Sequence, residues 1–339
     1  MKVYRPKRTR PKVTIIGGGT GLPVILSSLK DKDADVTAIV TVADDGGSSG
    51  ALRKMFNTVP PGDIRNVLAA LSDMPEKQKE IFQYRFKSED KILNGHSLGN
   101  LIILATSEMH GSIYQAIQLL GKMMHIDGHV YPASEEPLIL HAHYTDGTSE
   151  EGESKIARPD KTIDYVSVST TDKDNITAKA GKKVVSSIMN ADMVVLGPGS
   201  LYTSILPSLM IPEVGKAIVE TTAQVLYISN IMTQMGETEG FDDANHVEVF
   251  CKHLGHNFID TVLVNNAEVP KEHVAKISDD EYLLQVEHNF KRLEELVPII
   301  ISNDFLNITE NGVYHDGDKV ADEILRAVSF NHRTLKIKK

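Results

Sequence analysis

Short runs of apolar and β-branched residues recur along the chain and alternate with longer segments of helical periodicity. The runs predict strands at 13–16, 36–43, 137–144, 162–169, 192–197, 224–231, 260–265 and 297–302. Apolar residues three and four positions apart predict helices at 23–30, 50–56, 63–72, 97–108, 112–124, 178–190, 243–254 and 319–328. Near-continuous apolar runs are typical of strands covered on both faces. The pattern therefore predicts an α/β fold with a doubly wound, mostly parallel, Rossmann-like sheet in a three-layer arrangement.

One region departs from this alternation. Residues 63–124 contain three successive helical segments and no clear strand, which predicts a helical insertion at about 57–127, after the second strand. We expect this insertion to cover the carboxyl edge of the sheet. The polar, acidic stretch 145–161 predicts a loop or an irregular hairpin. The remaining pattern indicates one large domain at 12–330 between basic tails at 1–11 and 331–339.

Composition narrows the class of protein. The chain has 339 residues, a formal net charge of −10 and a single cysteine, Cys251. The acidic balance disfavours nucleic-acid binding. One cysteine cannot form an intrachain disulfide, and it fits the reducing cytoplasm. No apolar run reaches the roughly 18 residues of a membrane span, and no signal peptide is visible. We expect a cytoplasmic protein with no membrane span and, from the prevalence of twofold oligomers, a homodimer.

The first predicted strand leads into the glycine-rich sequence KVTIIGGGTGLP. A strand, a glycine turn and a helix together present free backbone N–H groups at the positive end of the helix dipole, which binds anions. Gly18, Gly19, Thr20 and Gly21 are the predicted phosphate-binding residues. Neither the G-x-G-x-x-G fingerprint nor the P-loop pattern matches, so a different phosphate turn is indicated.

The second predicted strand ends in ADDGGSSG. Asp44 follows Gly21 at the distance where an acidic residue meets a ribose in dinucleotide-binding folds. Asp44 and Asp45 are also candidate Mg²⁺ ligands, since Mg²⁺ binds one or two carboxylates together with substrate phosphates. Asp45 is in addition a candidate catalytic residue. The loop residues Gly47, Ser48 and Ser49 are predicted to contact the nucleotide. Residues 46–50 also match the G-x-S-x-G elbow of serine hydrolases, an alternative that places the serine early in that fold's usual order.

Polar loops later in the chain repeat this theme. Because ligands bind outside the carboxyl ends of strands in doubly wound sheets, we expect these loops to converge. His96 is a candidate phosphate ligand or proton donor. The remaining predicted nucleotide- or phosphate-binding residues are Arg65, Asn66, Asn100, Gly199, Ser200, Leu201, Tyr202, Asn230 and Thr233.

Six motifs in order carry a family resemblance: GGGTGL, ADDGGSSG, PPGDIRN, GHSLGN, GPGSLYTSILP and NIMTQMGET. With them, residues 12–330 resemble the gluconeogenesis-factor family, which is related to the 2-phospho-L-lactate transferases of deazaflavin-cofactor synthesis. The glycine turn and the acidic motif of the transferases match Gly18–Gly21 and Asp44–Asp45. Val24 stands where the transferases have lysine, and their acidic motif lacks the full Gly-Gly-Ser-Ser-Gly run.

The resemblance implies a function. Family members are cytosolic, bind UDP-sugars, and are needed for growth on gluconeogenic carbon sources and for normal cell shape. It therefore implies a regulatory factor with a nucleotide-sugar or other dinucleotide-like ligand and with protein partners in cell-wall synthesis. The alternative is an Mg²⁺-dependent transferase of the 2-phospho-L-lactate type, acting on a nucleotide-activated donor.

Overall fold

A computed structural model describes residues 10–87, 89, 93–172, 176–270, 284–310 and 312–337. Its centre is a seven-stranded sheet in which every neighbouring pair is parallel. The order is β10–β9–β8–β7–β1–β2–β3. The strands are β1 (Lys12–Gly17), β2 (Asp35–Val40), β3 (His129–Pro132), β7 (Met193–Leu196), β8 (Gln224–Ile228), β9 (Thr261–Asn265) and β10 (Ile299–Asn303). The doubly wound α/β prediction is confirmed.

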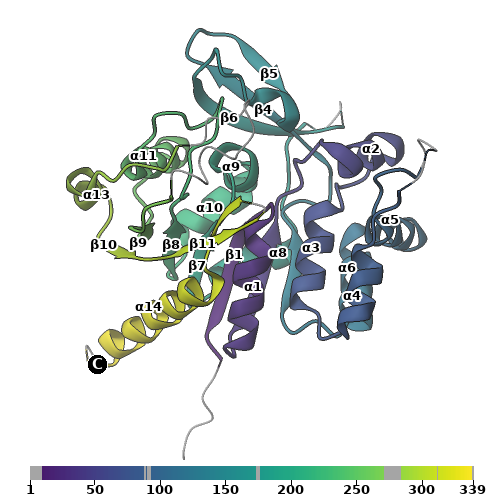
Figure 1. The fold of residues 1–339 in the computed structure, drawn as a ribbon, viewed down its shortest axis with the longest axis horizontal. Coiled ribbons are helices and arrows are strands. Elements are labelled where there is room, and N and C mark those ends of the chain that lie inside the picture. Colours follow the sequence, from purple (N-terminus) through teal and green to yellow (C-terminus); the bar gives the residue numbers. More distant parts are fainter. Residues whose placement is uncertain are drawn as a thin grey trace, which may run out of the picture.

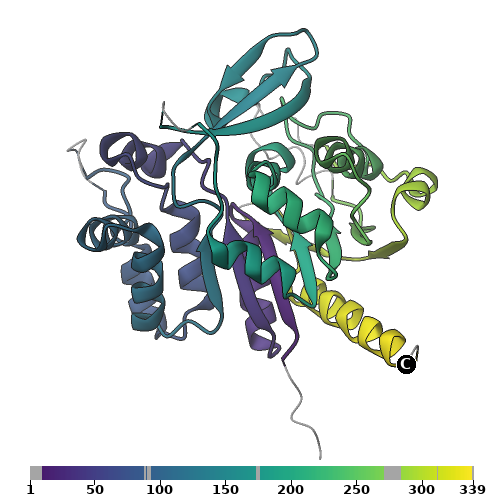
Figure 2. The same ribbon diagram turned by 180° about the vertical axis from the view of Figure 1, so that it is seen from behind.

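Helices cover both faces of this sheet. On the face seen in Figure 1 lie α1 (Gly21–Asp31), α3 (Gly62–Leu71) and α14 (Gly317–Ile337), and α1 packs against both of the others. On the face seen in Figure 2 lie α8 (Lys182–Met189) and α10 (Pro212–Glu220). The strands between them are apolar because water reaches neither face; all four residues of β7 are buried, for example.

The helical insertion is the crossover between β2 and β3. It consists of α2 (Gly47–Phe56), α3, α4 (Glu76–Gln83), α5 (Leu98–His110) and α6 (Ile113–Met123). The expectation that it covers the carboxyl edge of the sheet is wrong. Since α3 packs against α1, β2 and β3, the insertion lies against a face of the sheet, and its other helices flank it (Figure 1).

A second, antiparallel sheet stands at the carboxyl edge instead (Figure 1). It consists of β4 (Leu138–Tyr144), β5 (Ser149–Glu151) and β6 (Ile163–Thr170), in the order β5–β4–β6, and α7 (Glu153–Ile156) follows β5. The predicted strands at 137–144 and 162–169 therefore exist, but outside the parallel sheet. Buried and half-buried residues alternate along β4, as expected of an antiparallel strand with one covered face.

The remaining elements complete the second half of the fold. They are a π-helix η1 (Leu201–Ile205), α9 (Leu206–Leu209), α11 (Asp243–Leu254), α13 (Phe290–Leu296), and a hairpin of β11 (Leu306–Thr309) and β12 (Gly312–His315). Helix α14 continues to Ile337, so most of the predicted basic tail at 331–339 is helical; the N-terminal basic segment lies largely outside the described residues. In the described part of the chain, no helix has the length and apolar character needed to cross a bilayer.

Candidate functional site

The carboxyl ends of β1 and β7 lie side by side where the strand order of the sheet reverses. From β1 the chain proceeds outward to β2 and β3, and from β7 it proceeds in the opposite direction to β8, β9 and β10. This reversal is the topological switch point, the place at which doubly wound sheets bind their ligands. Both strands end in glycine-rich loops, at 17–21 and 197–200. The glycine turn predicted to hold phosphate therefore lies at the switch point.

The two loops approach each other so closely that side chains do not fit between them. A Cβ atom at Gly18 would lie 2.5 Å from Cγ2 of Thr41 and 2.6 Å from Oδ2 of Asp63. A Cβ atom at Gly199, whose φ is +145°, would lie 3.1 Å from the carbonyl oxygen of Gly18. Packing thus requires glycine at both positions, and the backbone conformation also requires it at Gly199.

Side chains from the loop after β8 join this arrangement. Asn230 donates a hydrogen bond from Nδ2 to the carbonyl oxygen of Gly199 (3.1 Å) and accepts one at Oδ1 from the Tyr227 hydroxyl (3.0 Å). Gln234 Nε2 donates to the Ser200 hydroxyl at 2.7 Å. The structure therefore brings together the predicted residues Gly199, Ser200 and Asn230.

Three other predicted residues direct their side chains into the protein. Leu201 and Tyr202 begin η1, and their exposed fractions are 0% and 1%. Burial raises the pKa of the Tyr202 hydroxyl. Thr233 Oγ1 accepts a hydrogen bond from the backbone N–H of Leu284 at 3.1 Å. These side chains support the loops from beneath, so contact with a ligand would have to come from their backbone.

An acidic residue that the sequence analysis did not select lies against the glycine turn. Asp63, in the first turn of α3, accepts a hydrogen bond at Oδ2 from the backbone N–H of Gly19 (2.8 Å). Burial raises the pKa of this carboxyl group, and the charge of Asp44 raises it further. Gly19 is therefore not a free phosphate donor in this structure, whereas the first turn of α1, from Gly21 onward, has backbone N–H groups without intrahelical acceptors.

The two adjacent aspartates after β2 diverge. Asp44 Oδ1 accepts from the backbone N–H of Gly46 (2.8 Å), and its carboxyl group also hydrogen-bonds Ser49. Burial raises the pKa of Asp44. Asp45 Oδ1 instead accepts from the backbone N–H of Ser154 (2.9 Å), at the start of α7. Asp45 therefore anchors the second sheet, and Asp44 is the one that stays close to Asp63.

Two glutamates extend this acidic group from other segments. Burial raises the pKa of Glu153 to about 7, and the charges of Asp44, Asp45 and Asp63 add to the effect. Burial raises the pKa of Glu237 to about 8, with a further contribution from Glu153, and Oε2 of Glu237 is buried without a hydrogen-bond partner. In the described ranges, no three His, Cys, Asp or Glu side chains are close enough together to ligate one metal ion.

Five predicted residues form a continuous hydrogen-bonded network beside Asp44. Ser48 Oγ lies 2.8 Å from Nδ1 of His96 and 3.2 Å from Nδ2 of Asn100. Asn100 Oδ1 accepts from Nη1 of Arg65 at 3.1 Å, and Nη2 of Arg65 donates to Oδ1 of Asn66 at 2.8 Å. Gly47, with φ +46°, precedes Ser48 at the start of α2. The motifs around residues 48, 65 and 100 thus converge as predicted.

Asp63, Glu153 and Glu237 are the site residues that sequence reasoning missed. Asp63 and Glu237 lie inside quoted motifs, PPGDIRN and NIMTQMGET, so their positions were visible. Glu153 lies in the acidic stretch 145–161, predicted to be a loop or an irregular hairpin, and only the folding of the second sheet over the switch point brings it near Asp44.

Comparison with known proteins gives consistent matches over nearly the whole chain. The family model described as "2-phospho-L-lactate transferase CofD" matches residues 13–306. A Streptococcus pneumoniae protein named "Putative gluconeogenesis factor" is 54% identical, with 94% of this chain and 98% of that protein covered. A Listeria innocua protein named "Gluconeogenesis factor" is 47% identical, covering 94% of this chain and 96% of that protein.

The fold also matches a solved structure. The crystal structure of a Bacillus halodurans protein superposes with a TM-score of 0.88 at 40% sequence identity. The match covers 94% of this chain and all of the other. The arrangement of strands and loops described above is therefore shared with a protein whose structure was determined by crystallography.

Proposed function

Because this chain belongs to the gluconeogenesis-factor family, within the broader family of CofD-like proteins, we propose that it is a regulatory factor that binds a UDP-sugar at the switch point. The family and the names of its relatives support a gluconeogenesis-related role. Control of cell shape, location in the cytoplasm, protein partners in cell-wall synthesis and a homodimer stay predictions.

One observation carries the proposal: the glycine loops after β1 and β7 meet at the reversal of strand order. A diphosphate is expected at the first turn of α1, where Thr20, Gly21 and Leu22 offer backbone N–H groups. Each such anion contact contributes about 0.3–1 kcal/mol when exposed and up to ~2 kcal/mol when partly buried. The sugar and nucleoside would then lie along the loops containing Ser200 and Asn230.

The acidic group next to this turn fits a divalent cation. Asp44 and Asp63 are carboxylates whose pKa values are raised by burial, and neither has an ion-pair partner within 4 Å among the described residues. A bound Mg²⁺ ion would neutralise them and offset their repulsion of phosphate. Two carboxylates completed by ligand phosphates are a common Mg²⁺ environment, so the absence of a third nearby protein ligand is compatible with it.

The same acidic group supports the alternative, an Mg²⁺-dependent transferase of the 2-phospho-L-lactate type. In that reaction Mg²⁺ would supply charge neutralisation at the transferred phosphoryl group. Asp44 and Asp63 would hold the ion, and Glu153, whose pKa is raised to about 7, would exchange a proton with the acceptor. Val24 and the full Gly-Gly-Ser-Ser-Gly run favour binding over this reaction.

Calorimetry with UDP-sugars, GDP and NAD, each with and without Mg²⁺, tests the proposal, together with a mass-spectrometric search for products. Saturable binding of a UDP-sugar without turnover is the expected result. Conversion of a nucleotide-activated donor would support the transferase instead. If none of these nucleotides bound, or if a variant with Thr20 and Gly21 both changed to proline bound them normally, the switch-point site would be wrong.

A further inference from the structure

Hydrogen bonds join Ser48 to His96 and Asn100. We propose that this network makes Ser48 an activated nucleophile toward phosphate esters or anhydrides, with His96 as its base. This chemistry is separate from UDP-sugar binding. It would explain the G-x-S-x-G pattern at 46–50, which by itself is only a weak indication of a nucleophilic serine.

The direction follows from what each group can donate and accept. A guanidinium has only donors, so the atom of Asn100 that meets Nη1 of Arg65 must be the amide oxygen. The other end of the Asn100 amide is then NH₂, which can only donate, and it donates to Ser48 Oγ. The bond from Asn100 leaves the Ser48 hydroxyl hydrogen unused, and with the ring proton of His96 on Nε2 this hydrogen is donated to Nδ1, 2.8 Å away.

The surroundings favour the ionised form of Ser48. Ser48 is the second residue of α2, a ten-residue helix, so it lies at the positive end of the helix dipole. Asn100 hydrogen-bonds the oxygen that would become negative. Behind it, Arg65 is only 6% exposed, its Nε is buried without a partner, and its hydrogen bonds to Ser97, Asn100 and Asn66 all go to neutral groups. A buried cation of this kind stabilises negative charge on Ser48 Oγ and on the phosphoryl oxygens of a reactant, which indicates phosphorus as the electrophile.

The step is a displacement at phosphorus. Ser48 Oγ attacks the phosphorus atom and its proton passes to Nδ1 of His96, so that the Oγ–P bond forms. The bond from phosphorus to the leaving group breaks, the leaving group keeps the electron pair, and the proton on Nδ1 is returned to it. Water can later repeat the sequence on the phosphoserine with His96 again as base, which restores the free hydroxyl.

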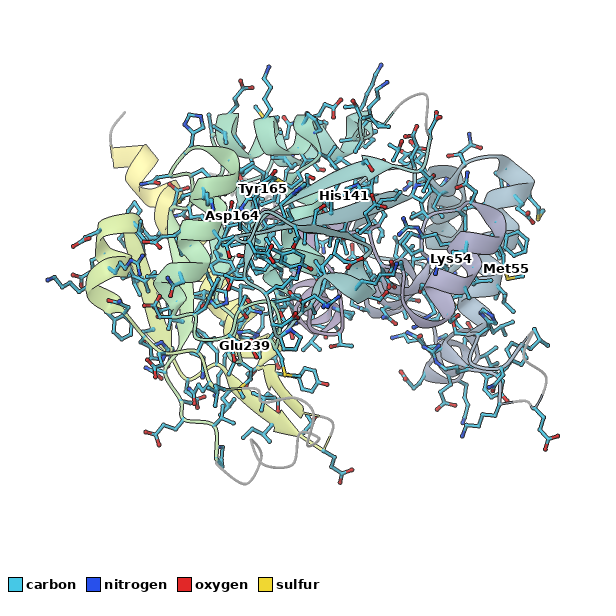
Figure 3. All side chains as sticks on the ribbon, turned by 90° about the horizontal axis from the view of Figure 1, so that it is seen from above. Lys54, Met55, His141, Asp164, Tyr165 and Glu239 are labelled. Carbon is cyan, nitrogen blue, oxygen red and sulfur yellow. The ribbon has the colours of Figure 1, made fainter. Side chains whose placement is uncertain are left out.

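A second serine–histidine pair in the chain can be compared with Ser48 and His96. Ser169 Oγ lies 2.7 Å from Nε2 of His141, a similar serine–histidine distance, on the second sheet. Figure 3 labels His141 on that sheet and Lys54 and Met55 on α2. Within the described residues, Ser169 has no hydrogen bond from an Asn–Arg pair. Proximity to histidine is thus common to both serines, and only Ser48 has the directed network.

Diisopropyl fluorophosphate is the probe, applied to the full-length protein without nucleotide and followed by intact mass and peptide mapping. The expected product is one adduct per chain on Ser48, formed as the Oγ–P bond replaces the P–F bond and fluoride leaves with the proton. No adduct, or labelling of Ser169 at a comparable rate, would overturn the proposal. UDP-sugar binding is measured separately, so either proposal can fail alone.

Two substitutions test the network without removing its bulk. His96→Asn keeps an acceptor near the position of Nδ1 but cannot take the proton, and labelling should slow roughly 100-fold. Asn100→Asp gives Arg65 an ion-pair partner but cannot donate to Ser48, and labelling should slow by at least about tenfold while the thermal melting temperature is maintained. Ser169→Ala is the matched control and should label as the parent does. Unchanged labelling in both network variants would refute the role of His96 and Asn100.

Discussion

The carboxylate of Asp63 and the backbone amide of Gly19 are joined by a 2.8 Å hydrogen bond at the centre of the switch point. The amide is in the turn expected to bind phosphate, and its acceptor is an acidic group that phosphate would repel. The two observations are compatible if a cation bridges the carboxylate and the phosphate, or if Asp63 is protonated when the ligand binds. If a cation forms this bridge, Asp63 should control the dependence of ligand binding on Mg²⁺.

Asp63→Asn is expected to remove most of the dependence of ligand binding on Mg²⁺. Removal of the negative charge should strengthen UDP-sugar binding in EDTA by about tenfold, or ~1.4 kcal/mol, and should abolish most of the gain produced by Mg²⁺. Calorimetric titrations of both proteins with and without Mg²⁺ measure the effect. Asp73→Asn is the control, because Asp73 pairs with Lys30 on the surface. Equal Mg²⁺ dependence in the parent and Asp63→Asn would show that Asp63 does not govern the site.

Gly18→Ala is expected to damage both stability and binding. The new methyl group would lie 2.5 Å from Cγ2 of Thr41 and 2.6 Å from Oδ2 of Asp63, so the turn would have to open. Overpacking of this kind costs about 1–3 kcal/mol. Gly46→Ala is the matched control in the neighbouring loop, since its methyl group would meet Oδ1 of Asp44 at an ordinary 3.4 Å. Urea denaturation and calorimetry of the two variants should differ clearly; similar behaviour would contradict the packing argument.

The fold was predictable where local pattern and tertiary environment agree. Strands buried on both faces, such as β1 and β7, are apolar throughout, and their alternation with helices indicates the doubly wound sheet. The second sheet was not separated from the first, although Leu138–Tyr144 alternates buried and half-buried positions, a signal for one covered face. The helices between 201 and 220 were missed because their apolar residues face the core on several sides.

The glycine loops and the hydroxyl-bearing motifs of the site could be predicted from the sequence, but which acidic residues belong to the site could be predicted less well. A glycine turn that follows a predicted strand can be recognised in the sequence as part of a ligand site, because the fold places the carboxyl ends of parallel strands at one edge. Asp45 and Asp44 are chemically identical in the sequence, and only the contact of Asp45 with Ser154 separates their roles. Glu153 and Glu237 depend on the second sheet and on the loop after β8 folding over the same edge, contacts that span more than eighty residues of chain.

Asn230→Ala should loosen the contact between the loops after β7 and β8. Its Nδ2 bond to Gly199 is lost, and the Tyr227 hydroxyl, in a side chain that is 0% exposed, loses an acceptor. Loss of a buried partner costs about 1–3 kcal/mol. The double variant Tyr227→Phe with Asn230→Ala should recover part of this stability but not the ligand affinity, because only the Gly199 contact belongs to the site. Recovery of both in the double variant would show that Asn230 acts through Tyr227 alone.

Glu153 and Glu237 should each contribute less to the stability of the folded protein as the pH rises from about 5 to about 8. The pKa of Glu153 is raised to about 7 and that of Glu237 to about 8, whereas in the unfolded chain both carboxyl groups ionise near their ordinary value. Between those values the folded state holds protons that the unfolded state has released. Unfolding is therefore increasingly favoured as pH rises through this window, by on the order of 1–3 kcal/mol in total, and the effect levels off above both raised pKa values.

Urea denaturation in EDTA at intervals from pH 5 to pH 8.5 measures this slope. Glu237→Gln should flatten it: the variant should match the parent at pH 5, where Glu237 is already neutral, and exceed it at pH 8.5, where the parent must bury a charge. Glu239, labelled in Figure 3, lies two residues away with an exposed side chain, so Glu239→Gln is the control and should leave the slope unchanged. Mg²⁺ should stabilise the parent more at pH 8.5 than at pH 5, because only ionised carboxylates attract it. If the difference in stability between Glu237→Gln and the parent were the same at pH 5 and at pH 8.5, Glu237 would ionise at the same pH in the folded and unfolded states.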